Sequence, residues 1–488
     1  MSYKADVNPN GSDDSQGGSL RRGLKKNQVQ MVALGGVIGS AYFLGTGYTL
    51  SATGPGAIVA FAFAGVLVFM MMLCLGELSV AMPVAGSFIG YTSEFVSPAV
   101  ACGIGWAYWA CIVAYVPSEC VAAGIIMNNF FPMIQPFYWA VLFGLLITII
   151  NIGKVEGLGK VESVLALTKI IAILAFSVLA ILIFLGIIGS EHSFIGTTYV
   201  IDRGGFFPVG AFALVLTMVM VLVNYGGTEI VGLTAAEAED PATAIPAAVK
   251  NVSVRIVGLY VIPLFLLSLI FPWDQAGTEE SVFAAALGYH GLNWAGGLFS
   301  FIVLIAAFSC ANCNLYACIR ALYSLAKEGM APTVFGKLNK KSVPSNAALF
   351  SLILIWIVIG CYSFDTSGFF YTYLLAISGF TGALCWLTIC LAQVNFRKRF
   401  HARGYTLDEL KFKVPGSPYT GYITVILFTL CLLINVLSPD LRPAFYIGVP
   451  AFLIPAILYK VLKVADRRGE EIKKLVDFDG MYPPKNRG

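Results

Sequence analysis

Charged residues are scarce in this chain of 488 amino acids. Asp, Glu, Lys and Arg together make up 12% of the sequence, whereas soluble domains carry about 25%. Hydrophobic residues account for 58%, and the mean hydropathy is +0.80. Water would not solvate a surface with so few charges, so the composition predicts a protein embedded in lipid. The net charge of +4 is too small to indicate a nucleic-acid partner.

The sequence also lacks the groupings that catalysis or metal binding would need. It has three histidines, and none accompanies Cys or Asp within an apolar stretch. Cys310 and Cys313 have the spacing of a metal-binding pair, but they stand in an apolar stretch without a second pair, which favours ordinary helix packing. We therefore expect no enzyme activity, no catalytic residue, no metal and no cofactor. The eleven cysteines lie in apolar stretches and predict reduced thiols.

No cleavable signal peptide is visible before the first apolar segment. Residues 1–27 are polar and end in a basic run, and the apolar stretch that follows has no cleavage-type end. We interpret residues 1–27 as a cytoplasmic N-terminal tail and residues 28–463 as a membrane domain. Residues 464–488 are rich in charge and predict a solvated cytoplasmic C-terminal tail.

Twelve segments are apolar and about as long as a membrane crossing, which needs about 20 residues. An even number places both chain ends on the same side. With the N-terminus inside, the outer loops contain only Arg203 and Arg442 among Lys and Arg residues. This asymmetry predicts a multi-pass protein of the cell membrane with both termini cytoplasmic. The segments are 28–49, 56–78, 99–127, 136–152, 160–188, 208–235, 251–271, 294–325, 346–363, 369–394, 419–437 and 442–463.

Paired glycines interrupt the helical pattern of the first and sixth segments. They are Gly35-Gly36 and Gly226-Gly227, and each glycine costs about 1 kcal/mol relative to alanine inside a helix. A single pair is typical of close helix packing. Pairs at corresponding positions of two halves instead indicate a binding site in an inverted-repeat transporter. Unwound backbone offers N–H groups to a carboxylate and carbonyls to an ammonium, and a zwitterionic amino acid carries both.

Three ionisable residues inside the predicted segments are candidates for function. Lys169 is about nine residues into the fifth segment, roughly 13 Å deep, which makes it a candidate proton carrier unless its amine reaches the inner interface. Glu229 follows the glycine pair of the sixth segment, and it would bond freed backbone groups or carry a proton. Glu119 lies in the outer half of the third segment, either facing the substrate path or near the interface.

Several short motifs follow one another along the chain. They are the stretch 20–42, Gly54-Pro55-Gly56, Leu75-Gly76-Glu77-Leu78, the stretch 82–88, Gly105-Trp106-Ala107-Tyr108-Trp109, the stretches 227–232 and 236–241, and Arg320-Ala321-Leu322-Tyr323. From about residue 20 to residue 460, the chain resembles in this order the amino acid permeases of the amino acid–polyamine–organocation superfamily. The bacterial lysine, aromatic amino acid and γ-aminobutyrate permeases are the relatives that the chain resembles.

The resemblance implies an all-α membrane protein with the inverted-repeat fold of the leucine transporter. Its five-helix repeats would be residues 28–188 and 208–394, with broken helices 1 and 6, and two further helices would occupy residues 419–463. The resemblance also implies that the substrate carboxylate binds Gly39, Ser40 and Ala41 and that carbonyls of Val37, Val223 and Gly226 hold its amino group. Lys169 matches the family's lysine of the fifth segment, which in proton-coupled members occupies the place of a sodium ion, and it is the candidate for proton coupling. Further candidate site residues are Glu119, Asn224, Tyr225, Gly227 and Thr228 for the substrate and Glu229 for the proton.

Three positions depart from the family pattern. Ala41 stands where Gly is usual, Val223 where an aromatic gate is common, and Asn224 where Ser is common, so we expect a different pocket specificity. The predicted function is proton-coupled uptake of an amino acid by alternating access, with membrane lipid as the surrounding partner. An amino acid exchanger and a sodium-coupled symporter are the alternatives. An amino acid sensor is disfavoured because the C-terminal tail is too short for a signalling domain.

Overall fold

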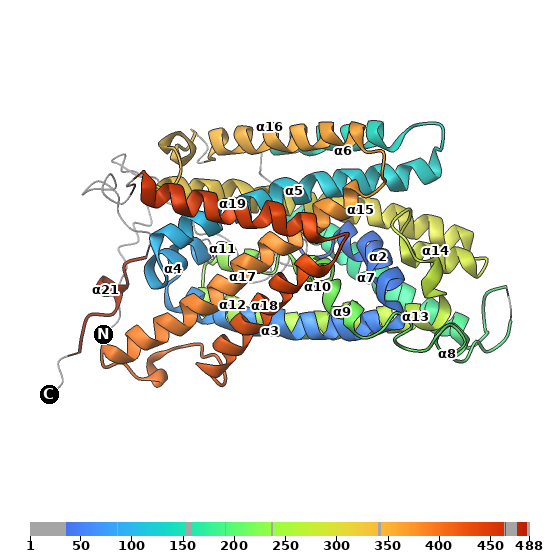
Figure 1. The fold of residues 1–488 in the computed structure, drawn as a ribbon, viewed down its shortest axis with the longest axis horizontal. Helices are drawn as coiled ribbons and strands as arrows, with labels where there is room; N and C mark the ends of the chain where they lie inside the picture. Colours follow the sequence, from blue (N-terminus) through green and yellow to red (C-terminus); the bar gives the residue numbers. More distant parts are fainter. Residues whose placement is uncertain are drawn as a thin grey trace.

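The computed structural model describes residues 36–84, 86–152, 158–190, 192–235, 238–339, 343–462, 464 and 476–485. Every regular element in these ranges is a helix, which confirms the all-α prediction. The principal elements (Figure 1) are η1 (Ala41–Gly45), α2 (Thr46–Thr53), α3 (Ala57–Ala81), α4 (Ser87–Phe95), α5 (Pro98–Phe130), α6 (Pro136–Ile152), α7 (Leu158–Phe184), α8 (Thr198–Ile201), α9 (Phe212–Leu216), α10 (Met218–Leu222), η3 (Val223–Tyr225), α11 (Ile230–Thr234), α12 (Pro241–Arg255), η4 (Ile256–Val261), α13 (Ile262–Ile270), α14 (Val282–Tyr289), α15 (Asn293–Lys327), α16 (Ser345–Cys361), α17 (Phe370–Ala402), α18 (Tyr419–Ile434), α19 (Arg442–Val461) and α21 (Phe478–Met481).

Eight helical runs within the described ranges are long and apolar enough to cross a membrane. The run Ala41–Ala81 covers parts of the first two predicted segments, and three shorter apolar helices coincide with the fourth, sixth and seventh. The structure therefore supports a multi-pass membrane protein, while the count of twelve spans and the inverted repeat stay predictions. The other seven runs are Pro98–Phe130, Val164–Phe184, Asn293–Lys327, Ser345–Phe364, Phe370–Ala402, Tyr419–Leu437 and Arg442–Val461.

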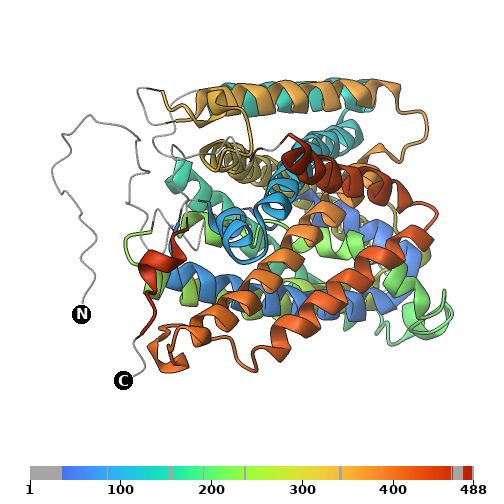
Figure 2. The same cartoon turned by 60° about the vertical axis from the view of Figure 1, so that its left-hand side comes forward.

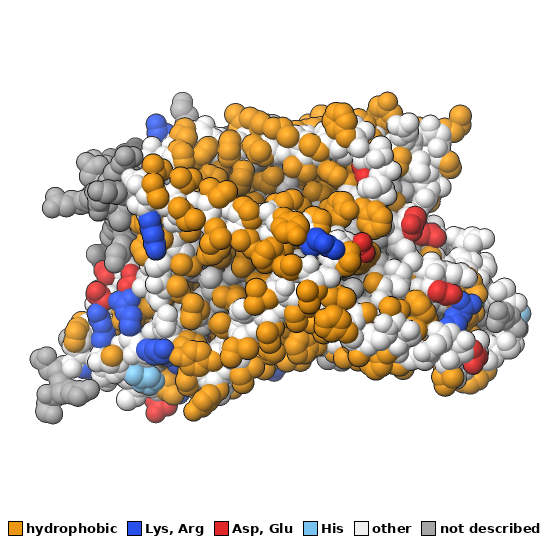
Figure 3. Space-filling model, in the orientation of Figure 1, with side chains coloured by type: hydrophobic (Ala, Val, Ile, Leu, Met, Phe, Trp, Pro, Cys, Tyr) orange, Lys and Arg blue, Asp and Glu red, His pale blue; other side chains and the backbone are white. Residues whose placement is uncertain are grey.

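The outer surface of the helix bundle is apolar. Figure 3 shows hydrophobic side chains over the middle of the visible face, with most charged side chains toward its two ends. Large side chains on the outer helices, such as Ile149 of α6 and Ile357 of α16, are 65% and 55% exposed. Exposed apolar area of this extent is unfavourable in water, so these faces are suited to contact lipid.

The helix α5 is the centre of the bundle. It packs against α6, α15, α17 and α19, and most of its residues are buried. Figures 1 and 2 show it surrounded by these helices in both views. A helix that is apolar around its whole circumference belongs in such a position, and α5 carries the polar side chains of Tyr115 and Glu119 into the protein interior.

The interruption predicted in the sixth segment is confirmed. The helical run of α10 and η3 ends at Tyr225, residues 226–229 form turns, and α11 begins at Ile230. In the first segment, residues 36–39 form turns and bends, and helical structure begins at Ser40. The part of that segment before Gly36, including Gly35, lies outside the described residues.

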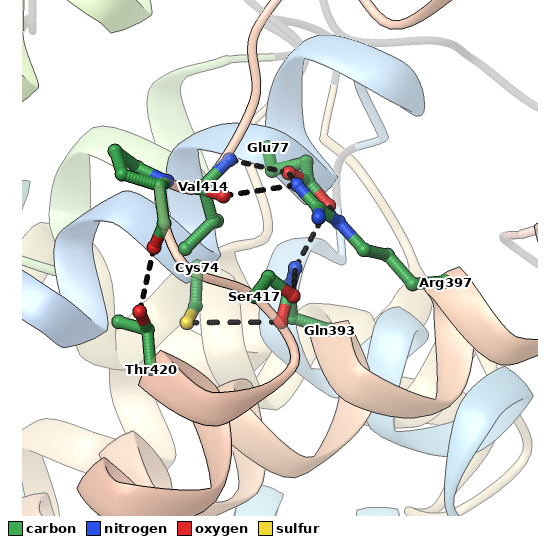
Figure 4. Close-up of polar contacts among 8 residues, drawn as sticks. Cys74, Glu77, Gln393, Arg397, Val414, Ser417 and Thr420 are labelled. Carbon is green, nitrogen blue, oxygen red and sulfur yellow. Dashed lines mark hydrogen bonds and ion pairs between the residues drawn. The ribbon is translucent and has the colours of Figure 1, made fainter. Parts of the chain in front are cut away.

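A buried ion pair joins α3 to α17 near the end of the bundle that carries α4. The Glu77 carboxylate accepts hydrogen bonds from the Arg397 guanidinium at 2.5 and 2.8 Å, from the Gln393 amide at 2.8 Å and from the Val414 N–H at 2.6 Å. Figure 4 shows these groups converging on the carboxylate. Because both charges are buried and well paired, the cluster fixes α3 against α17 and the loop that follows α17.

The C-terminal segment departs from the prediction of a solvated tail. Within its described residues 476–485, Val476 and Phe478 are 1% and 0% exposed. The short helix α21 lies beside α4 at one end of the bundle in both views (Figures 1 and 2). Aromatic side chains in a charged tail thus bind the folded domain, since burying them removes apolar area from water.

Candidate functional site

The interruptions of the first and sixth segments touch each other. Gly227 has φ +92°, a conformation that glycine adopts without a steric penalty. A Cβ atom at this position would lie 2.4 Å from the Gly36 carbonyl oxygen and 3.3 Å from the Val37 amide nitrogen. The contact therefore requires glycine, and it places the two non-helical stretches side by side in the bundle.

The Glu119 carboxylate accepts a hydrogen bond from the backbone of the first interruption. The Ser40 N–H donates to both carboxylate oxygens, at 2.9 and 3.2 Å. A Cβ atom at Gly39 would lie 2.2 Å from one of these oxygens, so glycine allows the carboxylate to approach. The Tyr371 hydroxyl donates to Ser40 Oγ at 3.0 Å. Glu119 is 1% exposed, so the carboxylate is buried against the first interruption.

Lys169 lies in the same buried region. Its side chain is 0% exposed, and its charge attracts the Glu119 carboxylate. Lys169 is therefore buried within the protein, while its depth in the membrane and its role stay predictions. The structure brings a cation, an anion and the unwound backbone of the first segment together in the buried interior.

Groups of α15 hold the carbonyl of Gly36. The Cys310 thiol donates to this oxygen at 3.1 Å, and so does the Asn314 side-chain amide at 3.1 Å. The Cys310 sulfur also lies 3.4 Å from the Tyr115 hydroxyl. The spacing of Cys310 in an apolar stretch predicted only a helix-packing residue. In the structure its thiol instead donates to the backbone of the first interruption. The presence of polar residues such as Asn314 in an otherwise apolar helix was the sequence feature that could have indicated a functional role for this part of α15.

Glu229 is held by three donors. It accepts hydrogen bonds from the Tyr108 hydroxyl at 2.9 Å, the Trp386 indole N–H at 3.0 Å and the Gly227 N–H at 3.2 Å. The predicted contact between Glu229 and freed backbone is confirmed. The two aromatic donors come from α5 and α17, far away in the sequence, so the glycine pair alone did not reveal them.

The polar residues of η3 bond mainly within the protein. The Asn224 amide nitrogen donates to the Met220 carbonyl at 2.7 Å, and the Tyr225 hydroxyl donates to the Phe61 carbonyl at 2.8 Å. Among the described residues, Asn224 Oδ1 and Thr228 Oγ1 are buried without a hydrogen-bond partner. A buried acceptor or hydroxyl without a partner costs free energy, and such atoms are suited to bind a ligand.

A cavity borders the interruption of the sixth segment. Val223, Gly226, Gly227 and Glu229 are the predicted site residues that line it. The other predicted site residues, among them Ser40, Glu119 and Lys169, do not line it. Its further lining residues come from α5, α10, α15 and α17 and were not predicted as site residues: Cys111, Ile112, Tyr115, Leu222, Asn314, Ser378, Gly379, Gly382 and Trp386.

Val37 and Ala41 complete the predicted set. Both are buried, at 2% and 0% exposed, on either side of Ser40. Ala41 begins η1, whose π-type turn lies directly after the interruption, and turns of this type are frequent at functional sites. Gly39 and Ser40 of the first segment therefore lie against Glu119, whereas Val223, Gly226, Gly227 and Glu229 of the sixth border the cavity.

Comparison with known proteins gives one consistent result. The amino acid permease family profile matches residues 28–469. Amino-acid permease RocE of Bacillus subtilis (strain 168) is 36% identical over 460 residues, which are 92% of this chain and 97% of the relative. Lysine-specific permease LysP of Escherichia coli (strain K12) is 33% identical over 466 residues, which cover 91% of this chain and 94% of the relative. The gamma-aminobutyric acid permease of Bacillus subtilis is 34% identical over 419 residues, which cover 85% and 87%. With a family match over most of its length and an apolar helical architecture, this chain belongs to the amino acid permeases of the amino acid–polyamine–organocation superfamily and is a membrane transporter of amino acids, not an enzyme.

Proposed function

We propose that this permease takes up an amino acid together with a proton, by alternating access. The observation that carries the proposal is the Glu119 carboxylate on the Ser40 N–H. The family resemblance assigns that backbone to the substrate carboxylate. Two anions sharing one donor repel each other strongly in a buried site. Substrate binding therefore requires that the Glu119 carboxylate is protonated or that its side chain moves away from the Ser40 N–H. Protonation would couple the binding of one proton to the binding of each substrate carboxylate.

The substrate head group would lie between the two interruptions. Backbone N–H groups of Gly39, Ser40 and Ala41 would bind its carboxylate, and carbonyls of Val37, Val223 and Gly226 would bind its ammonium. The contact between Gly227 and Gly36 supports this proposal, because it brings both sets of groups close together. The remaining candidates, Asn224, Tyr225, Gly227 and Thr228, would shape the wall around the substrate.

Lys169 would pair with one carboxylate before and after the substrate binds. Its ammonium attracts the ionised Glu119 carboxylate. Once Glu119 carries a proton, the substrate carboxylate replaces it as the anion near Lys169. The net charge of the site then rises by one, which is the charge of the bound proton. Glu229 is the second candidate proton carrier, because it is a buried carboxylate at the cavity wall. Sodium coupling and amino acid exchange are the competing mechanisms.

Uptake into proteoliposomes tests this function. We expect the purified protein to concentrate radiolabelled L-lysine or γ-aminobutyrate, the substrates in the names of two relatives, under an imposed inward proton gradient without sodium. Competition by the twenty amino acids then identifies the preferred side chain. Accumulation that needs sodium and ignores the proton gradient would overturn the coupling. Failure to transport any amino acid in the panel would overturn the function.

The arrangement of the chain in the membrane is a further part of the proposal. Twelve spans, a 5+5 inverted repeat and two cytoplasmic termini would explain the near absence of Lys and Arg from the outer loops. Cysteines introduced at Ser2 and Asn486 should react with an impermeant thiol reagent in inverted membrane vesicles but not in intact cells. Labelling of either position in intact cells would contradict the twelve-span topology. A cysteine introduced at Arg203 serves as the control that reacts from outside.

A further inference from the structure

The described C-terminal segment 476–485, which we call the clamp, binds the helix ends through aromatic side chains. The Phe478 ring packs edge-on against Phe95 of α4 and Phe396 of α17, at centroid distances of 5.3 and 6.0 Å. The Tyr482 ring contacts Phe400 of α17 at 5.1 Å. Edge-to-face pairs of this kind add to the gain from apolar burial, so the clamp is a docked part of the fold.

Ion pairs hold the clamp on the same helix. The Asp479 carboxylate lies 3.1 Å from the Arg399 guanidinium and also pairs with Arg403. Arg403 donates a hydrogen bond to the Tyr482 carbonyl at 2.7 Å, and its own carbonyl accepts from the Lys485 N–H at 3.0 Å. Lys485 also pairs with Glu409, in the loop after α17. Such charge-assisted contacts give the docked position a defined geometry.

The clamp also reaches a second membrane helix. The Tyr482 hydroxyl donates to the carbonyl of Ala81, the last residue of α3, at 3.2 Å. The clamp therefore joins α3 to α17 at the same end of the bundle as the Glu77–Arg397 ion pair. α17 lines the cavity with Ser378 and Trp386. Any opening of the cavity toward this end that separates α3 from α17 must break the clamp contacts as well.

We propose that the clamp is an intramolecular latch that holds the cavity closed toward the cytoplasm and is released when the transporter opens to that side. This inference rests on the proposed alternating access. In the latched state the aromatic and ionic contacts favour the closed arrangement, and weakening them shifts the population toward the open one. The clamp therefore determines how often the cavity becomes accessible from the side that carries α21.

The native thiol of Cys111 provides a reporter that does not depend on transport. Cys111 lines the cavity, and its thiol donates to the Ser378 carbonyl. An impermeant maleimide is added to inverted or right-side-out vesicles that contain the full chain, and labelling of Cys111 is followed by peptide mass spectrometry. We expect Asp479→Arg and Phe478→Ala to speed labelling about tenfold in inverted vesicles only, since a small free-energy shift suffices for that change.

The exposed ion pair between Asp408 and Lys413 offers a matched control, because it lies in the neighbouring loop outside the clamp. Asp408→Arg should leave the labelling rate unchanged. Asp479 is 65% exposed, so its substitution leaves the core packing in place. Unchanged labelling in both clamp variants would overturn the proposal that the clamp holds the cavity closed. Faster labelling in right-side-out vesicles would overturn it as well. A wild-type protein that fails to transport while its clamp variants label faster would overturn the proposed function and leave the latch standing.

Discussion

Gly227→Ala is expected to reduce amino acid uptake more than tenfold. An alanine would have to adopt the left-handed conformation of φ +92°, which costs roughly 1–2 kcal/mol. Its Cβ would also meet the Gly36 carbonyl oxygen at 2.4 Å. Because the opposing atom belongs to the backbone, relief requires the two interruptions to separate. A strain of about 1.4 kcal/mol already lowers the competent population tenfold, and initial uptake rates in proteoliposomes measure the loss.

Gly360→Ala is the matched control for this substitution. Gly360 lies within α16, and no described atom beyond its own helix lies within 4 Å of the position that a Cβ would take. Alanine favours a helix over glycine by about 1 kcal/mol, so this variant should transport normally and unfold at an equal or higher temperature. Wild-type uptake by Gly227→Ala would contradict a binding site built from the contact of the two interruptions.

The position of the membrane helices was predictable because it depends on short-range properties of the sequence. Hydropathy and the length of a crossing define each segment without knowledge of its neighbours. The interruption of the sixth segment was predictable for the same reason, since Gly226 and Gly227 stand together in an apolar stretch. The position of Lys169 within the apolar helix α7 was also visible from the sequence alone.

The partners of these residues were not predictable, because they come from helices distant in the sequence. Glu119 was assigned to the substrate path or the interface, and only the packing of α5 against the first segment places it on the Ser40 N–H. Tyr108 and Trp386 meet at Glu229 from α5 and α17. No periodicity or composition within one segment encodes such a contact between segments.

The C-terminal tail shows where composition misled the prediction. Its many charges indicated a solvated segment, but Phe478 and Tyr482 interrupt the charged sequence. These rings pack among Phe95, Phe396 and Phe400, while the charges pair with the ends of α17 and its loop. Isolated aromatic residues in a charged tail were therefore the more informative signal, because their burial supplies much of the free energy of docking.

Glu119→Gln is expected to abolish proton-driven accumulation while substrate binding persists. If Glu119 takes up one proton for each bound substrate, wild-type affinity should fall tenfold for each pH unit above the range in which the carboxyl ionises. The sign follows from linkage, because a rising pH removes the proton that binding requires. Glutamine cannot ionise, and its neutral oxygen accepts the Ser40 N–H more weakly than a carboxylate does. Substrate can then displace it at any pH.

The pH dependence of labelled-substrate binding therefore distinguishes the candidate proton carriers. Glu119→Gln should bind with an affinity that is flat between pH 5 and pH 9, within about a factor of two, and it should exchange substrate without concentrating it. A steep pH dependence that persists in this variant would exclude Glu119 and direct the assignment to Lys169 or Glu229.

Lys169→Ala should also lose accumulation. It leaves the Glu119 carboxylate without a nearby cation, so the carboxyl should protonate more readily and binding should stay pH-dependent, over a range displaced to higher pH. That displacement, absent from Glu119→Gln, identifies Lys169 as the partner charge and Glu119 as the group that carries the proton.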